Sequence, residues 1–306
     1  MPPADSDSLV DRRRLKRRLS LWRTLAVVAA MAAAALAIDA EGDIFGRPYV
    51  ARLWVTGFIS DDSQRDETLA RLAKDDDVKA VVVRIDSPGG SVGGGEALYR
   101  TLADLAAKKP TVAVIGSLGT SAAYMAALGT ERIFVRDSSV TGSIGVIMQT
   151  ADVTSLLDRL GIKPETIKSA PLKAVPNPVE TLTPEGREAA QAIVRDLFEQ
   201  FVDMVALRRR MERADALRYA DGRVFTGRQA KAMGLVDDTG GETAARAWLA
   251  ETKAVPTTVR AVDVRPDDAG GWLGATLHAI GKSLFSERLS IDGPIAVWHP
   301  GLRVGE

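Results

Sequence analysis

Gly116 to Ala127 reads Gly-Ser-Leu-Gly-Thr-Ser-Ala-Ala-Tyr-Met-Ala-Ala, and it follows the apolar run Thr111-Val112-Ala113-Val114-Ile115. This order predicts a buried strand, a tight glycine turn and the start of a helix. Ser121 would then hold its hydroxyl and the next backbone N–H at a helix N-terminus, where negative charge is favoured. An acyl-transfer enzyme needs this arrangement for its nucleophile and its oxyanion. The alternative is that Ser121 only caps the helix, which is a common role for serine there.

A second strand and glycine turn precede this stretch. Lys79 to Ile85 contains the continuous apolar run Ala80-Val81-Val82-Val83, typical of a strand buried in a parallel sheet. Asp86-Ser87-Pro88-Gly89-Gly90-Ser91 follows and predicts a turn before a helix over 96–108. The turn matches neither the phosphate-binding loop nor the dinucleotide fingerprint. The remaining interpretations of this turn are an oxyanion hole or a plain turn without a function. Further strands and helices alternate along the body, which predicts an α/β fold with a mainly parallel sheet.

The composition restricts the chemistry. The 306 residues carry no formal net charge and include no cysteine, which excludes disulfides, thiol nucleophiles and zinc–thiolate sites. The only histidines are His278 and His299, far along the chain from Ser121. We therefore expect a lysine or carboxylate base, as in the Ser-Lys variant of the catalytic triad, and neither a metal nor a cofactor. Residues 1–23 hold an excess of basic residues, so the rest is net acidic and no nucleic-acid partner is expected.

The N-terminal residues have the pattern of an exported protein. Six Lys and Arg residues between positions 12 and 18 precede an uncharged run over 24–38, and Asp39 and Glu41 follow. This predicts a basic cytoplasmic segment over 1–20 and one transmembrane signal anchor over 21–40, in contact with membrane lipid. A cleaved signal peptide is the alternative, because Ala35-Leu36-Ala37 fits a cleavage site. A folded domain over 45–252 and a C-terminal extension over 253–306 complete the predicted organisation.

Two lysines lie on a proline-rich stretch that interrupts the alternation. Residues 167–180 include three prolines and predict an extended loop carrying Lys168 and Lys173. A long amphipathic helix is expected over 184–211, opened by Thr183. Near the C-terminus, apolar residues at helical spacing over 272–285 predict a helix that packs on the body or on another subunit.

Five motifs in order carry a family resemblance over roughly residues 48 to 250. They are Arg84–Gly90, Ser121 with its small neighbours, Thr141–Val146, Glu165–Ser169 and Asp221–Ala230. On these motifs the chain resembles signal peptide peptidase A (SppA) in its short, single-repeat form. The resemblance implies a crotonase-like, Clp-protease-like fold and a membrane-anchored bacterial serine endopeptidase. Its substrates would be signal-peptide remnants or other exported apolar peptides.

The resemblance also implies the site residues. These are Ser121 as nucleophile, Lys173 as general base (Lys168 being the less favoured choice), Ser143 as the residue that orients the lysine, and the backbone N–H groups of Gly90 and Ala122 as the oxyanion hole. Family members pack as homo-oligomeric rings in which the serine and the lysine of one site come from neighbouring subunits. The implied location is the bacterial inner membrane, single-pass, with the N-terminus cytoplasmic and the catalytic domain periplasmic.

A lysine base imposes a further physical requirement. Lysine accepts a proton only when neutral, and its unperturbed pKa is about 10.4. Burial among apolar groups must lower that pKa, so we expect Lys173 to be buried near the Ser121 hydroxyl. Two other functions stay open at this point. One is an acyl-CoA enzyme of the crotonase fold, and the other is a membrane scaffold that has lost catalytic activity.

Overall fold

The computed structural model describes residues 18–19, 21–31, 47–265 and 295–297 of a chain that forms two units, Met1–Arg47 and Pro48–Glu306. In the first unit, residues 21–31 are helical and exposed. No helix within these described ranges has both the length and the apolar character needed to cross a membrane. The anchor expected over 21–40 therefore rests on its sequence pattern. Residues 32–40, like most of the basic segment, lie outside the described part.

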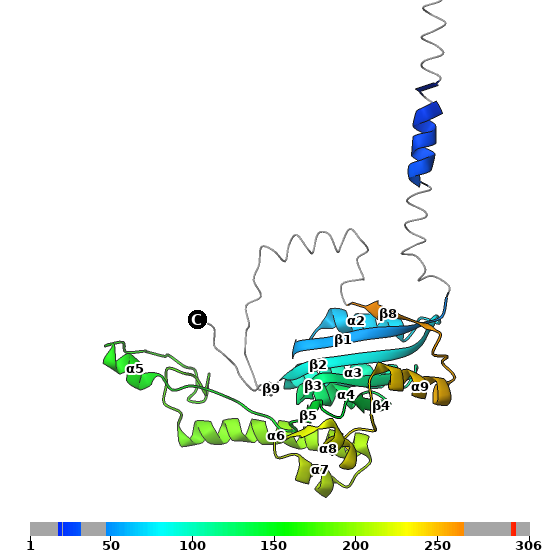
Figure 1. The fold of residues 1–306 in the computed structure, drawn as a ribbon. Helices are drawn as coiled ribbons and strands as arrows, with labels where there is room; N and C mark the ends of the chain where they lie inside the picture. The colour runs from blue at the N-terminus through cyan, green and yellow to red at the C-terminus, as the bar shows by residue number, and fades with distance from the viewer. Residues whose placement is uncertain (1–17, 20, 32–46, 266–294, 298–306) are drawn as a thin grey trace, which may run out of the picture. The chain divides into compact units, whose positions relative to one another are not determined.

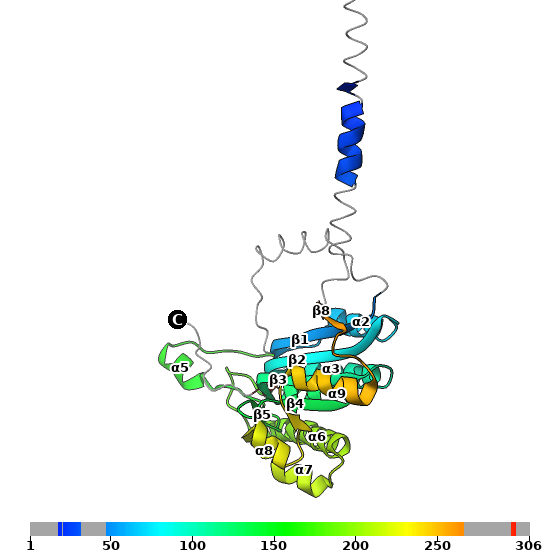
Figure 2. The ribbon, with the colours of Figure 1, turned by 45° about the vertical axis from the view of Figure 1, so that its right-hand side comes forward.

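A mainly parallel sheet forms the centre of the second unit (Figures 1 and 2). Its strand order is β6-β5-β3-β2-β1-β8, with β4 between β3 and β7, and β9 paired with β2. The strands are β1 (Tyr49–Ile59), β2 (Val78–Ser91), β3 (Thr111–Thr120), β4 (Arg132–Val135), β5 (Val140–Gly142), β6 (Val224–Thr226), β7 (Asp238–Thr239), β8 (Arg260–Val264) and β9 (Ile295–Val297). Among the described strands only β5–β6 and β2–β9 pair antiparallel. The predicted α/β class is confirmed.

Helices cover both faces of this sheet. They are α2 (Ser63–Leu72), α3 (Val92–Ala106), α4 (Ala122–Ala127), α5 (Thr154–Arg159), α6 (Pro184–Arg209), α7 (Arg213–Tyr219), α8 (Gly227–Ala232) and α9 (Glu242–Lys253). Val81 and Val83 of β2 belong to the core that includes α3, α4 and α6, whereas Ala80 and Val82 pack on the α9 side. Because both faces are covered, every residue of the run 80–83 is apolar, as predicted.

Strands β2 and β3 continue further than their apolar runs, and β3 extends to Thr120 through the glycines that were predicted to form a tight turn. The stretch predicted as a glycine turn, Asp86 to Ser91, remains part of β2 and pairs with β1 through Gly89 and Gly90. The prediction of a turn was wrong because glycine lets the two backbones approach closely enough to extend the ladder. Helix α3 consequently begins at Val92, where the Ser91 side chain accepts a hydrogen bond from the Gly94 N–H. The sheet also continues to Val264, since β8 pairs with β1.

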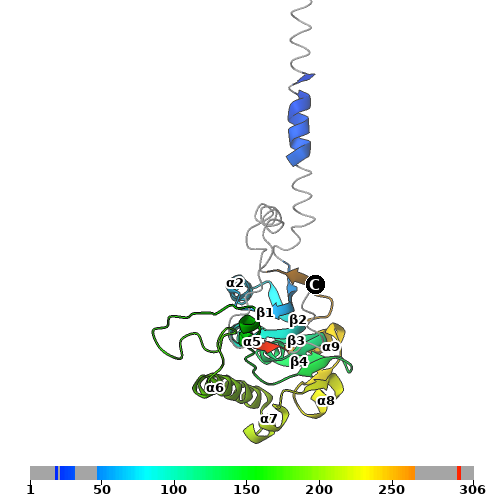
Figure 3. The same ribbon diagram turned by 90° about the vertical axis from the view of Figure 1, so that its left-hand side faces the viewer.

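Residues 147–182, here called the arm, lie beside the sheet rather than on it (Figures 1 and 3). They contain the short helix α5, of which no residue is buried. Helix α6 then begins at Pro184, capped by Thr183 as expected, and its second half returns to the core through Phe201, Val202 and Val205. The helix expected over 272–285 lies outside the described residues.

Candidate active site

The carboxyl end of β2 presents a glycine pair beside β1. Ser87 Oγ donates a hydrogen bond to the Gly57 carbonyl of β1 at 2.6 Å and accepts one from the Gly89 N–H at 3.1 Å. A Cβ on Gly90 would lie only 1.9 Å from the Ile59 carbonyl oxygen, so only glycine fits there. Gly89 has a φ of 113°, so the strand departs from regular extended geometry at this pair. Because Ser87 Oγ accepts from the Gly89 N–H, the amide of the pair that the resemblance assigns to the oxyanion hole is that of Gly90.

The end of β3 is held against this glycine pair. Thr120 Oγ1 donates to the Pro88 carbonyl at 3.0 Å, and Asp86 Oδ1 accepts from the Leu118 N–H at 3.1 Å. On the other side of β3, Thr141 Oγ1 donates to the Gly119 carbonyl at 2.7 Å. These bonds connect β2, β3 and β5 immediately before Ser121. The loop that carries the predicted nucleophile is thus positioned next to Gly90.

Ser121 adopts a backbone conformation that a helix cap does not need. Its φ of 57° and ψ of −121° lie in a region that costs a non-glycine residue about 1–3 kcal/mol, and its side chain makes no capping hydrogen bond. The Ser121 N–H donates to the Gly142 carbonyl at 2.8 Å, while its own carbonyl accepts from the Met125 N–H at 2.9 Å. The simple capping interpretation is therefore wrong. The hydroxyl stands at a strained strand-to-helix turn, as nucleophiles of acyl-transfer enzymes do.

Ala122 is the first residue of α4 and belongs to the buried core. The first N–H groups of a helix have no partner within the helix, so this amide can bind an oxyanion next to Ser121. A Cβ on Gly95 of α3 would lie 2.8 Å from the Ala122 side chain, so α3 and α4 are in close contact here. Small residues at this crossing allow α4 to start directly behind Ser121.

Ser143 lies close to Ser121 through the pairing of β3 with β5. Thr120 pairs with Gly142, and Ser143 is the next residue along the chain. It is buried, has a φ of 51°, and donates its N–H to the Arg223 carbonyl at 2.8 Å. The structure thus brings together Gly90, Ser121, Ala122 and Ser143, all predicted from the sequence.

Lys173 is not where the sequence led us to expect it. It is exposed on the arm, and its side chain makes no hydrogen bond or ion pair within the described residues. The expectation that it is buried beside Ser121 is wrong for the single chain, because no residue that the structure describes covers its side chain. Its role as the base stays a prediction. Lys168, the other candidate, forms an ion pair with Glu180, and the hydrogen bond from Lys168 holds the pKa of that carboxyl below its ordinary value.

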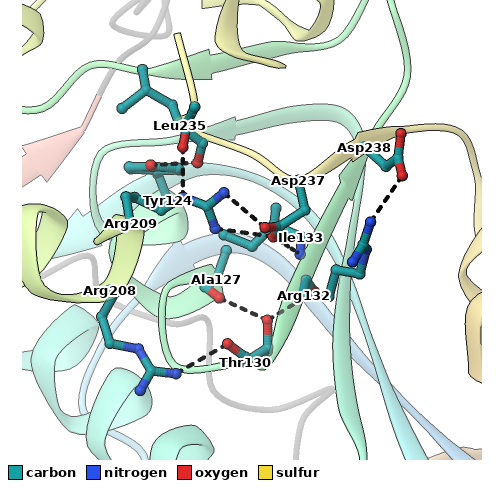
Figure 4. Close-up of polar contacts among 11 residues, drawn as sticks. Tyr124, Ala127, Thr130, Arg132, Ile133, Arg208, Arg209, Leu235, Asp237 and Asp238 are labelled. Carbon is teal, nitrogen blue, oxygen red and sulfur yellow. Dashed lines mark hydrogen bonds and ion pairs between the residues drawn. The ribbon is translucent and has the colours of Figure 1, made fainter. Parts of the chain in front are cut away.

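A partly buried set of polar contacts surrounds α4 (Figure 4). Tyr124 is fully buried and donates its hydroxyl to the Leu235 carbonyl at 2.7 Å, and burial raises the pKa of that hydroxyl well above its ordinary value. Arg209 of α6 pairs with both oxygens of Asp237, which also accepts from the Ile133 N–H at 2.8 Å. These contacts connect α4, α6 and β4, and so fix the helix that follows Ser121.

Several positioning residues were not foreseen. Ser87, Thr120 and Thr141 donate the hydrogen bonds that align the strand ends, yet no role was predicted for them. Ser87 and Thr141 lie inside two of the motifs that carried the resemblance. The roles of these hydroxyls could be recognised only in the structure, because strands β2 and β3 continue beyond the apolar runs from which they were predicted.

The fold and this site together define a serine peptidase with a Clp-protease-like α/β domain. Residues 103–256 match the Peptidase family S49, and residues 51–154 match the Clp protease family. The chain belongs to peptidase family S49, and within it to the SppA type.

Three relatives illustrate the similarity. The chain is 37% identical over 205 residues to a protein of Synechocystis sp. named "Putative protease", which covers 67% of this chain and 74% of that protein. It is 32% identical over 260 residues to a "Putative protease" of Methanocaldococcus jannaschii, covering 79% and 83%. The "Putative signal peptide peptidase SppA" of Enterococcus faecium is 29% identical over 245 residues, covering 74% of this chain and 70% of that one.

Proposed function

We propose that the chain hydrolyses peptide bonds with a Ser121/Lys173 dyad and an oxyanion hole formed by the Gly90 and Ala122 N–H groups. The observation that carries the proposal is the strained conformation of Ser121, which makes no capping hydrogen bond and follows Thr120, whose hydroxyl is bonded to Pro88 two residues before Gly90. Strain of this kind persists where it serves a function.

The reaction would proceed in two steps. Ser121 Oγ attacks the substrate carbonyl carbon while its proton passes to the neutral amine of Lys173. The carbonyl oxygen becomes negative and is stabilised by the two backbone N–H groups. The C–N bond then breaks, and the lysine returns its proton to the leaving amine. Water repeats the attack on the acyl-enzyme and frees the new carboxyl group and Ser121.

The lysine would come from a neighbouring copy. Lys173 is exposed and its side chain has no partner within the described part of the chain. The arm around it carries apolar side chains that the described residues leave uncovered. Ile167, for example, is 95% exposed. The remaining large apolar residues exposed on the arm are Ile147, Leu156, Leu160, Ile162, Leu172 and Val179. A surface of this kind is typical of a protein–protein contact. In a ring of identical copies the arm of one subunit would cover the Ser121 site of the next and bury Lys173 there.

We further propose that the protein is a signal-anchored enzyme of the bacterial inner membrane with its catalytic domain in the periplasm. The charge pattern of residues 12–41 supports this orientation. Exported apolar peptides, including signal-peptide remnants, are then the substrates within reach of the site.

The test is a complementation experiment with a fluorogenic apolar peptide. Ser121→Ala and Lys173→Ala should each abolish turnover in an intact oligomer, whereas Lys168→Ala should retain it. When the two inactive variants are mixed and reassembled in equal amounts, a site shared between neighbours is complete in about one quarter of cases. Recovery of about one quarter of wild-type activity supports the shared dyad. No recovery places both residues in one chain, activity in Lys173→Ala removes it as the base, and an inert wild-type oligomer favours the scaffold function.

A further inference from the structure

A polar cavity lies where helices α4 and α6 end. Leu128 is the C-cap of α4, Arg210 is the C-cap of α6, and both line the cavity. Its volume is about 600 Å³, a size typical of small-molecule sites. Four of the lining residues are arginines, namely Arg132, Arg208, Arg209 and Arg210. The proposed peptidase mechanism uses none of these four side chains.

The lining of the cavity carries more positive than negative charge. Its two carboxylates are Glu131 and Asp237. Each already pairs with a cation of this chain, Asp237 with Arg209 at 2.9 and 3.0 Å, and Glu131 with a lysine. Arg208 and Arg210 form no ion pair with any residue that the structure describes. Two positive charges at the cavity are therefore not balanced by carboxylates of the described chain.

Capping of the helix ends accounts for only part of this cluster. Arginines near a helix C-terminus commonly donate to its last carbonyls. The Arg208 guanidinium donates in this way to the Leu128 and Thr130 carbonyls at 2.6 and 3.1 Å (Figure 4), and it has further N–H groups to give. The Arg210 side chain is exposed and makes no hydrogen bond within the described ranges. Capping therefore leaves donors of both arginines available to a ligand.

We propose that this cavity binds a ligand that carries a phosphate monoester. The inference does not depend on the peptidase mechanism. A guanidinium binds phosphate oxygens through two parallel hydrogen bonds. A phosphate monoester has a charge of about −1.5 to −2 at neutral pH, which the two unbalanced arginines match, whereas a carboxylate has a single charge. The volume of the cavity leaves room for the group that bears the phosphate.

The helix ends make the site depend on its arginines. Both helices direct their C-terminal, partially negative ends toward the cavity, and this disfavours an anion there. The arginines must therefore supply the attraction. Binding should weaken as the ionic strength rises, and it should weaken when either unbalanced arginine is removed.

The experiment is a calorimetric titration of the full-length protein in phosphatidylcholine nanodiscs, with glycerol phosphate as the probe. Sodium chloride at the same ionic strength and succinate, a dicarboxylate, are the controls. Wild type should bind glycerol phosphate in preference to both. Arg210→Gln should weaken binding about tenfold, because hydrogen bonds to a charged group are lost. The matched variant Arg195→Gln removes the same charge from an exposed position on α6 outside the cavity, and it should bind as wild type does.

The lipid composition distinguishes two sources of the phosphate. Phosphatidic acid in place of part of the phosphatidylcholine is compared with phosphatidylserine at equal surface charge. Weaker binding of glycerol phosphate with phosphatidic acid alone means that the lipid head group fills the cavity, and an unchanged titration assigns the cavity to a soluble phosphate ester. Either result supports the phosphate site.

Two results would overturn the inference. One is wild-type binding of glycerol phosphate no stronger than that of chloride or succinate. The other is equal binding by wild type and Arg210→Gln. The variant should remain folded, with the wild-type midpoint in urea, because the Arg210 side chain is exposed and makes no bond within the described ranges.

Discussion

Replacing Gly90 by alanine tests whether the end of β2 forms the oxyanion hole. The added Cβ would meet three backbone atoms of Ile59, the nearest at 1.9 Å, where ordinary contact begins at 3.4 Å. Backbone atoms of a paired strand cannot rotate away, so β2 must move from β1 by roughly 1.5 Å or the ladder must open at this point. Either change displaces the Gly90 N–H from the position where it would meet the oxyanion.

The expected loss is large in activity and moderate in stability. Removing one oxyanion donor lowers kcat by about 10²–10³-fold, or about 2.7–4 kcal/mol in the barrier. Overpacking of this kind costs about 1–3 kcal/mol of folding free energy. Turnover of a fluorogenic peptide and urea unfolding of the same preparation measure the two effects separately.

Gly93→Ala is the matched control. No atom lies within 4 Å of the Cβ that it would add, and Gly93 is in the first turn of α3, where alanine is the better helix former. It should keep wild-type turnover and gain up to about 1 kcal/mol of stability. A Gly90→Ala variant whose kcat stays within threefold of wild type would refute both the close approach and the oxyanion role of Gly90.

Three further predictions concern the body and the arm. Tyr124→Phe leaves the buried Leu235 carbonyl without its donor and should lower the free energy of unfolding by about 1–3 kcal/mol, measured in urea; an unchanged midpoint would contradict the bond. The hydrogen bond from Lys231 lowers the pKa of Asp238, so its stabilising effect is complete above about pH 4 and is lost as the pH falls through the lower folded-state pKa. Thermal unfolding of wild type and Asp238→Asn should therefore differ slightly at pH 7 and converge toward pH 2, and a constant difference would argue against the shift. Leu160→Asp places a charge on the exposed face of the arm and should shift sedimentation toward smaller species; unaltered assembly would locate the subunit contact elsewhere.

The strands and residues of the candidate site show how much could be predicted from the sequence. The apolar runs 80–83 and 111–115 were sufficient to predict buried parallel strands, because a strand covered on both faces must be apolar throughout. Ser121 was predicted as nucleophile or cap from its place between a strand and a helix. The family resemblance, whose motifs are short and local, implied the roles of Gly90, Ala122 and Ser143.

Only the tertiary structure decided how these parts meet. The positive φ of Ser121 distinguishes a strained turn from an ordinary helix cap. This φ depends on the hydrogen bond from the Ser121 N–H to Gly142 of β5, which no local sequence pattern predicts. The extension of β2 to Ser91 depends on contact with β1, which is distant in sequence. Pairing of β9 with Gly90 joins residues some two hundred positions apart, and no local pattern records it. The surroundings of Lys173 could not be predicted from the sequence either. Burial of the Lys173 side chain depends on what packs against the arm, whereas the sequence determines only that the arm carries apolar side chains.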